Sequence, residues 1–358
     1  MERETKTYVL KRPDDEATPR KLSIDYRVAL NSQQLAAVTV GEGPSLVIAG
    51  AGSGKTRTLV YRVAYLIDSG VDPSNILLLT FTRKSAQEML ERAGELIGAR
   101  SQRVCGGTFH SVANLLLRRY GRSIGVEPGF TILDRGDAED LIALVRSQLG
   151  LNEKDKRFPR KGTIMEMVSK SANTLRSLDE IILDEFGHFA DHMEDLGRLQ
   201  KAYQAAKRQK QLLDYDDLLV MLRELLLRDE AARTTISRQY RYILVDEYQD
   251  TNRLQAEVIR QLASTHNNVM IVGDDSQSIY GFRGATFKNI MEFPSLFPGT
   301  TMYKLEENYR STQPILNLAN CIIDEAAEKY TKRLFTRKID GPLPSLVEAA
   351  GENTQSRF

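Results

Sequence analysis

The chain has 358 residues, of which 41% are hydrophobic and 27% are charged, and its formal net charge at pH 7 is +1. This length has room for two or three domains, and the near-neutral balance means that any surface for nucleic acid must be a local patch. The two distant cysteines, Cys105 and Cys321, exclude a disulfide scaffold, and no apolar run approaches the roughly 20 residues of a membrane span. We therefore expect a soluble cytoplasmic protein.

The N-terminal region begins with a polar arm, residues 1–20, which is rich in charge and broken by Pro13 and Pro19, so we expect it to be flexible. Residues 31–38 are typical of a capped helix start, with Asn31 as the N-cap and Gln34 three residues further on. From the pattern alone, Gln34 serves either this cap or a ligand.

The most informative stretch is residues 45–56, in which a short apolar run leads into a small-residue loop and then Gly-Lys-Thr. A strand, a tight turn and a helix start present backbone N–H groups to a phosphate chain. Lys55 would reach the β- and γ-phosphates of a nucleotide and Thr56 would hold Mg²⁺. The pattern departs from G-x-x-x-x-G-K-[ST] at Ala49, and the alternative is a glycine-rich turn that binds nothing.

Strands and helices alternate after this loop. A helix is expected over residues 55–69, a buried strand over 76–79, a helix over 86–97 and a further strand and loop over 104–111. This alternation predicts an α/β fold with a doubly wound parallel sheet, whose loops at the carboxyl edge bind ligands.

Helical patterns replace the strand signals from about residue 112 to residue 212, including 137–148, 163–175 and 191–213. We interpret this region as a helical insertion within the sheet domain. It contains a basic loop at residues 154–161, which is either a solvated charge run or a contact for a nucleic-acid backbone.

Sheet character returns with strands over 242–245, 269–272 and 301–305, followed by a helical pattern over 313–329. The first of these strands ends in Asp246 and Glu247. Asp246 would coordinate Mg²⁺ through water beside Thr56, and Glu247 would polarise the attacking water. Phosphoryl transfer also needs a positive charge at the γ-phosphate. Three arginines could supply it, and their spacing does not rank them: Arg57, Arg283 and Arg310.

Seven stretches occur in the order of the motifs of UvrD/Rep/PcrA-like superfamily 1 DNA helicases, which the chain resembles over about residues 22–345. They are residues 49–56, 80–86, 107–111, 214–219, 246–252, 272–285 and 305–311. The family also has Ala at the position of Ala49. The resemblance implies a RecA-like P-loop NTPase sheet flanked by helices, with an all-helical inserted subdomain.

The resemblance also implies roles at a site for ATP and Mg²⁺. Gln34 matches the glutamine that reads adenine, Tyr309 the aromatic that stacks on adenine, and Gln277 the glutamine that links the γ-phosphate to DNA. The set of catalytic residues it implies is Lys55, Asp246, Glu247, Gln277 and Arg310. The nucleotide-binding set is Gln34, Ala51, Gly52, Ser53, Gly54, Lys55, Thr56, Arg57, Tyr309 and Arg310, with Thr56 and Asp246 at the metal.

On the DNA side, the resemblance implies contacts from Phe81, Thr82, Arg83, His110, Tyr280, Phe282 and Arg283. Stacking of bases on aromatic rings is sequence-tolerant, which suits a translocating motor. Phe282 often appears as Trp in relatives, and Arg83 stands where relatives usually have Asn. Core packing is the alternative for Phe81 and Phe282.

The expected organisation is an arm (1–20), a discontinuous RecA-like lobe (21–112 and 213–312), the insertion (113–212) and the start of a truncated second lobe (313–358). The predicted function is that of an ATP-dependent DNA helicase of UvrD type, moving 3′ to 5′ on single-stranded DNA and acting at junctions with duplex, with repair or replication proteins as partners. We expect the chain alone to bind nucleotide weakly, to be a weak or inactive ATPase, and to unwind little or nothing. The alternatives are a P-loop ATPase switch and a DNA-binding module without unwinding activity.

Overall fold

The structure of the chain is a computed structural model that describes residues 22–151, 158–278, 288–326, 329–348 and 350–356. Three of the predicted DNA contacts, Tyr280, Phe282 and Arg283, lie outside the described residues, as do the arm at 1–20 and residues 154–157 of the basic loop.

The centre of the fold is a six-stranded sheet in the order β3-β2-β6-β7-β1-β8, and every neighbouring pair is parallel. Its strands are β1 (Ser45–Ala49), β2 (Ile76–Thr80), β3 (Cys105–Thr108), β6 (Tyr242–Val245), β7 (Val269–Gly273) and β8 (Thr301–Leu305). The predicted parallel α/β sheet is confirmed. Strands β1, β2 and β7 are buried along their whole length, as expected where helices cover both faces, whereas β8 is mostly exposed at the edge.

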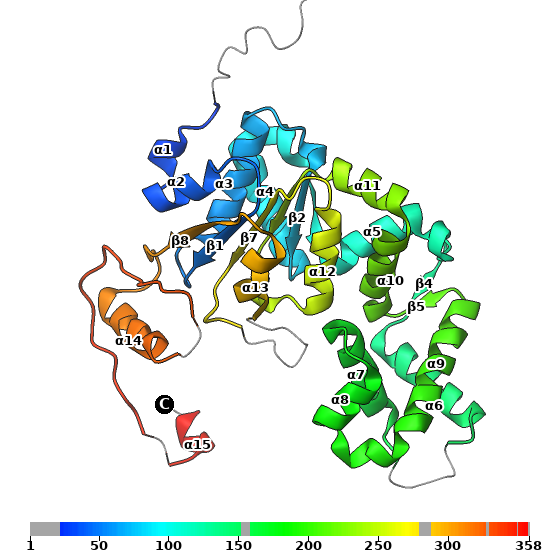
Figure 1. Ribbon diagram of the computed structural model, residues 1–358. Helices are drawn as coiled ribbons and strands as arrows, with labels where there is room; N and C mark the ends of the chain where they lie inside the picture. Colours follow the sequence, from blue (N-terminus) through cyan, green and yellow to red (C-terminus); the bar gives the residue numbers. More distant parts are fainter. Residues whose placement is uncertain (1–21, 152–157, 279–287, 327–328, 349, 357–358) are drawn as a thin grey trace, which may run out of the picture.

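Helices pack on both faces of this sheet (Figure 1). One core holds Leu46 and Ile48 of β1, and the other holds Val47 and Ala49, because successive side chains of a strand point to opposite faces. The first face is covered by α5 (Phe109–Tyr120), α10 (Tyr215–Arg228), α11 (Glu230–Gln239), α12 (Arg253–Leu262) and α13 (Lys288–Leu296). The second face is covered by α1 (Tyr26–Ala29), α2 (Ser32–Val38), α3 (Lys55–Asp68) and α4 (Arg83–Ile97).

A separate hydrophobic core lies among four further helices, below and to the right of the sheet in Figure 1. They are α6 (Arg135–Gln148), α7 (Lys161–Thr174), α8 (Leu178–Glu185) and α9 (Met193–Gln209). A two-stranded parallel sheet of β4 (Thr131–Ile132) and β5 (Leu212–Leu213) joins this helical subdomain to the rest of the chain. The insertion expected to be all-helical therefore includes short strands.

The packing of the two cores places the start of the insertion later than the expected residue 113. Ala113, Leu117 and Phe130 belong to the core of the sheet, whereas the separate core begins at Leu133. An amphipathic helix pattern shows that α5 buries one face but does not show against which core. We therefore propose that the subdomain begins near residue 131.

Helix α14 (Gln313–Asp324) is shorter than the pattern over 313–329 predicts. Lys329 caps its end, because the Nζ atom donates to the carbonyls of Ile323 and Asp324. The last helix is α15 (Glu352–Gln355), and the 3₁₀ helices are η1 (Pro73–Asn75), η2 (Gly98–Arg103), η3 (Gly121–Ile124), η4 (Gly187–His192) and η5 (Tyr248–Asp250). None of the described helices combines the length and apolar character that a membrane span requires.

Candidate functional site

At two positions of the loop between β1 and α3, the backbone has a conformation that only glycine adopts without strain. Gly52 has φ +76° and Gly54 has φ +88°, and α3 begins at Lys55. A Cβ atom on Gly52 would lie 2.7 Å from Cβ of Arg310, and one on Gly54 would lie 2.7 Å from Nε2 of Gln34. The loop is therefore closely enclosed by two distant parts of the chain, and the helix N-terminus behind it suits an anion.

Lys55 reaches from the start of α3 to the loop after β6. Its Nζ atom lies 2.7 Å from Oε2 of Glu247 and 3.5 Å from Oε1 of Gln277, and the Lys55 side chain is only 9% exposed. The structure thus brings together three of the predicted catalytic residues from three separate strand ends.

Asp246 is buried beside this pair, with 4% of its surface exposed. Its Oδ1 atom accepts a hydrogen bond from the backbone N–H of Glu247 at 3.0 Å. Burial and the neighbouring Glu247 charge raise the pKa of Asp246 to about 7, while Lys55 opposes this rise. The positive charge of Lys55 offsets only part of the cost of burying this carboxylate, so a cation bound beside it would be favourable.

Gln249 orients Glu247, whose own backbone is left-handed with φ +48°. Nε2 of Gln249 donates to Oε2 of Glu247 at 2.8 Å, and Oε1 of Gln249 accepts from the backbone N–H of Asp274 at 2.9 Å. The side chain of Gln249 therefore ties the loop after β6 to the loop after β7. The sequence analysis did not single out Gln249, although it lies within the stretch 246–252.

Gln34 forms the cap of α2, one of the two roles that the sequence left open, and also contacts the glycine-rich loop. Its contact with a ligand stays a prediction. Its side chain accepts from the backbone N–H of Asn31, which completes a capping box at the start of α2. Its Nε2 atom donates to the carbonyl of Ser53 in the glycine-rich loop at 3.1 Å. One amide oxygen and one amide nitrogen suffice for the two tasks.

The loop after β8 is fixed on the glycine-rich loop by backbone and side-chain hydrogen bonds. The N–H of Tyr309 donates to the carbonyl of Gly52 at 2.9 Å, and Nδ2 of Asn308 donates to the carbonyl of Ala51 at 2.6 Å. The Tyr309 hydroxyl accepts from Nδ2 of Asn31 at 2.8 Å, while 47% of Tyr309 remains exposed. The ring is thus held in place with a surface open to a ligand.

These parts enclose a cleft of about 830 Å³ that contains most of the predicted nucleotide-binding residues. Its predicted members are Gln34, Gly52, Gly54, Lys55, Thr56, Arg57, Glu247, Tyr309 and Arg310. The guanidinium of Arg57 donates to the carbonyl of Ala29 and lies 4.8 Å from the Tyr61 ring centre. Ala51, Ser53 and Asp246 do not line the cleft.

The cleft also contains residues that the sequence analysis missed: Arg92, Glu307, Asn308, Thr336, Arg337 and Lys338. Asn308 directly precedes Tyr309 and could have been found from that position. Arg337 and Lys338 carry no local signal, because they reach the cleft only through the path of the chain after α14.

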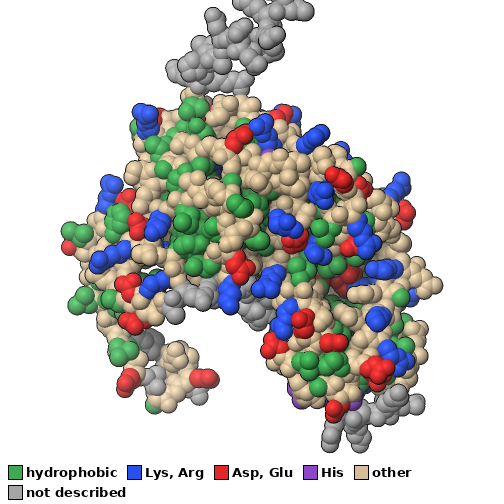
Figure 2. Space-filling view, viewed as in Figure 1, with side chains coloured by type: hydrophobic (Ala, Val, Ile, Leu, Met, Phe, Trp, Pro, Cys, Tyr) green, Lys and Arg blue, Asp and Glu red, His purple; other side chains and the backbone are tan. Residues whose placement is uncertain are grey.

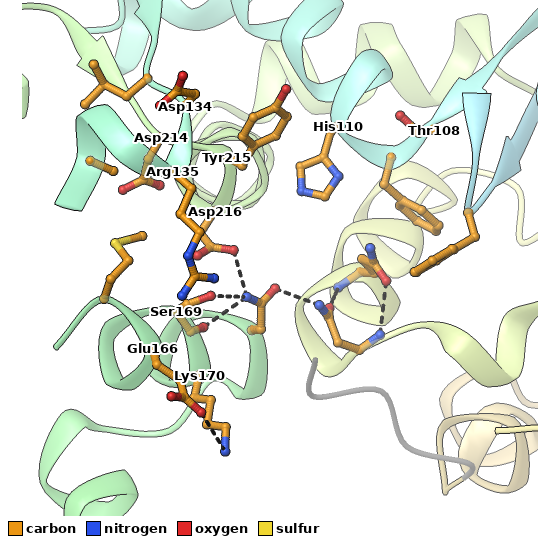
Figure 3. Close-up of a pocket in the computed structure, with 18 of the residues that line it drawn as sticks. Thr108, His110, Asp134, Arg135, Glu166, Ser169, Lys170, Asp214, Tyr215 and Asp216 are labelled. Atoms are coloured by element: carbon orange, nitrogen blue, oxygen red, sulfur yellow. Dashed lines mark hydrogen bonds and ion pairs between the residues drawn. The ribbon is translucent and has the colours of Figure 1, made fainter. Parts of the chain in front are cut away.

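A second pocket, of about 640 Å³, lies between the carboxyl edge of the sheet and the helical subdomain (Figure 3). Phe81 and His110 line it, whereas Thr82 caps α4 and, like Arg83, is exposed without lining the pocket. Burial lowers the pKa of His110 to about 4, so the imidazole is neutral at pH 7, and its ring meets Tyr215 edge-on at 5.8 Å.

The opposite wall of this pocket connects to the loop after β6 through amide side chains. Nδ2 of Asn173 donates to Asp216 at 2.8 Å, and Oδ1 of Asn173 accepts from Nδ2 of Asn252 at 2.7 Å. Asn252 caps α12. Figure 2 shows the molecule hollowed beneath the sheet, between the helical subdomain and the C-terminal region, with Lys and Arg side chains on the rim of the hollow.

Comparison with known proteins places these features in context. The family model of the UvrD/REP helicase N-terminal domain matches residues 30–298. The ATP-dependent DNA helicase PcrA of Staphylococcus aureus (strain Mu50) is 38% identical over 330 residues, which are 92% of this chain and 44% of that protein. The protein of the same name from Staphylococcus epidermidis (strain RP62A) is 39% identical over 331 residues, with the same two coverages. The chain thus spans less than half the length of these relatives.

Proposed function

The chain belongs to the UvrD/REP helicase family, and from this premise we propose that it forms the ATP-binding part of an ATP-dependent DNA helicase that moves 3′ to 5′ on single-stranded DNA. The observation that carries the proposal is the contact of Lys55 with Glu247 at the glycine-rich loop, because it joins a phosphate-binding cation to a carboxylate that can act on water.

The cleft suits a nucleoside triphosphate in both shape and polarity. At one end, Gln34 and the held ring of Tyr309 offer hydrogen bonds and a stacking face to adenine. At the other end, Lys55 and the start of α3 receive the phosphates, and Arg57 and Arg310 on the wall of the cleft add positive charge.

The residues present also suit a Mg²⁺ ion. The carboxylate of Asp246, whose pKa is raised by burial and by the neighbouring Glu247 charge, and the hydroxyl of Thr56 are the hard oxygen ligands that this ion prefers. Thr56 and Asp246 would hold the ion, which would neutralise charge on the phosphates.

Hydrolysis itself then depends on the residues around Lys55. Glu247 orients the attacking water and accepts its proton, and Gln249 keeps the carboxylate in place. Lys55 and Arg310 stabilise the charge that spreads over the γ-phosphate oxygens in the transition state, and Gln277, next to Lys55, senses whether this phosphate is present.

Single-stranded DNA is the proposed polymer substrate, and Phe81 and His110 are its proposed contacts in the pocket below the sheet edge. Neutral His110 and Phe81 offer ring faces for bases, and stacking on such rings contributes about 1–3 kcal/mol per base. Thr82 and Arg83 would contact the backbone from their exposed positions. Junctions with duplex, repair or replication partners and a cytoplasmic location belong to the same proposal.

The proposal is tested by single-turnover ATP hydrolysis and by binding of a fluorescent oligothymidylate to the 358-residue chain. We expect Mg²⁺-dependent hydrolysis that the oligonucleotide accelerates and Lys55→Ala abolishes. His110→Ala should weaken oligonucleotide binding about tenfold, whereas Leu115→Ala, on the exposed side of the same helix, should not. A chain that binds ATP but ignores DNA would refute the helicase assignment.

A further inference from the structure

Residues 329–338, which follow α14, form an extended segment that we call the strap. Its side chains alternate between the interior and solvent: Lys332, Leu334 and Thr336 are buried, whereas the residues between them are exposed. This period of two is that of a strand. The strap is not a strand of the sheet, however, because the pairing found for it is one parallel bridge between Phe335 and Glu307.

The strap crosses the carboxyl ends of three neighbouring strands, which Figure 1 shows side by side as β8, β1 and β7. Phe335 pairs with Glu307, which follows β8. A Cβ atom on Gly50, at the end of β1, would lie 2.6 Å from Leu334. Lys332 contacts the acidic residues after β7. The order along the strap is therefore the order of the strands.

Lys332 is the cation between two adjacent acids. Its Nζ atom donates to Oδ1 of Asp274 and to Oδ1 of Asp275, and the three side chains are 1%, 3% and 2% exposed. Two neighbouring buried carboxylates repel each other and lack water, so their present arrangement depends on this ammonium group. The backbone N–H of Tyr330 also donates to Asp275, at 2.8 Å.

Asp274 in turn shapes the loop that carries Gln277. Its carbonyl accepts from the N–H of Gln277 at 3.0 Å, its Oδ1 accepts from the N–H of Ser276 at 3.1 Å, and its own N–H donates to Gln249. From there, Gln249 contacts Glu247, and Gln277 contacts Lys55. Two residues, Asp274 and Gln249, thus connect Lys332 to the carboxylate of Glu247.

The other end of the strap lies at the mouth of the nucleotide cleft. Thr336, Arg337 and Lys338 line the cleft. Arg337 lies 2.8 Å from Oε1 of the buried Glu307, and Nζ of Lys338 donates to the carbonyl of Tyr309 at 2.8 Å. The same ten residues therefore contact both ends of the site.

We propose that Lys332 is a positioning residue for ATP hydrolysis: by pairing with Asp274 and Asp275, it holds the loop of Gln277 against Lys55 and connects that loop, through the strap, to the mouth of the cleft. This inference rests on the proposed ATPase function. Lys332 does not line the nucleotide cleft, so its loss changes the rate of hydrolysis more than it changes the affinity for ATP.

The test compares the wild-type chain with Lys332→Met, which removes the charge at similar length, and with Lys329→Met, which removes a lysine of the same strap whose Nζ atom contacts the end of α14. Single-turnover hydrolysis, binding of a fluorescent ATP analogue and hydrogen exchange by mass spectrometry are measured on each. In Lys332→Met we expect hydrolysis to slow about tenfold, binding to change less than twofold, and exchange of residues 272–278 to accelerate. Lys329→Met should match the wild type in all three.

Unchanged hydrolysis in Lys332→Met, or slower hydrolysis with faster exchange throughout the chain, would overturn the inference, because Lys332 would then serve only the fold. If Lys332→Met does not fold, the double variant Lys332→Met with Asp275→Asn, which removes one of the unpaired charges, is judged by the same criteria. A wild-type chain that neither binds nor hydrolyses ATP would instead refute the proposed function.

Discussion

Replacing Gly52 by Ala tests whether the glycine-rich loop binds nucleotide only in the backbone conformation seen here. Gly52 has φ +76°, and a Cβ atom there would lie 2.7 Å from Cβ of Arg310 and 2.9 Å from Nδ2 of Asn308. Real Cβ atoms do not approach other heavy atoms so closely, so either the glycine-rich loop or the loop after β8 must move.

The size of the effect follows from the contacts that such a movement breaks. Nδ2 of Asn308 donates to the carbonyl of Ala51, and the N–H of Tyr309 donates to the carbonyl of Gly52. Losing two hydrogen bonds of about 1 kcal/mol each costs about 2 kcal/mol. If the nucleotide must restore the original geometry, its affinity falls about thirtyfold.

Gly43→Ala is the matched control, because Gly43 also has positive φ, at +106°, but nothing lies within 4 Å of an added Cβ atom. Both variants carry the backbone strain of about 1–2 kcal/mol, and only Gly52→Ala carries the clash. Titration with a fluorescent ATP analogue should therefore show weaker binding in Gly52→Ala alone, at temperatures where both variants are folded. Affinities within threefold of each other in the two variants would show that the contact with the loop after β8 does not matter.

Three further predictions concern the chemistry of the cleft. Glu247→Gln keeps the shape of the side chain but removes the base, so we expect ATP binding to persist while single-turnover hydrolysis slows at least about a hundredfold; normal turnover would mean that another group activates the water. Burial raises the pKa of Asp246 from 3.8 to about 7, so its contribution to stability is full below about pH 4 and is lost as the pH rises through 7. Asp246→Asn should accordingly raise the melting temperature more at pH 8 than at pH 4.5 in metal-free buffer, and an equal change at both would contradict the raised pKa. Tyr309→Ala should weaken ATP binding about tenfold and Tyr309→Phe less than threefold, whereas equal losses would assign the effect to the hydroxyl contact with Asn31 rather than to the ring.

The sheet was predictable because its local signals agree with its tertiary environment. The apolar runs of β1, β2 and β7 have no polar face, as a strand covered on both sides requires. The glycine-rich loop was equally clear, since its φ values at Gly52 and Gly54 need the residues that the pattern provides.

The parts that sequence reasoning missed depend on contacts between distant residues. Nothing near Lys332 indicates that it will meet Asp274 and Asp275, which lie 58 and 57 residues away. Likewise, the pattern over 313–329 continues past Asp324, but α14 ends there and Lys329 folds back to donate to its last carbonyls. For Gln34, the local pattern showed the cap of α2, but it could not show that the same side chain also contacts the distant carbonyl of Ser53 in the glycine-rich loop.

The strand order explains why so many distant residues meet at one loop. Strand β1 lies between β7 and β8, with Ile48 opposite Gly273 and Ala49 opposite Leu305, so all three strands end at one level. The loop that follows β1 must therefore lie between the loops that carry Gln277 and Tyr309. These two loops lie on opposite sides of the glycine-rich loop, and a nucleotide held there would couple them only while it is bound. The strap contacts both loops directly, through Lys332 and Phe335, so the protein chain itself also links them.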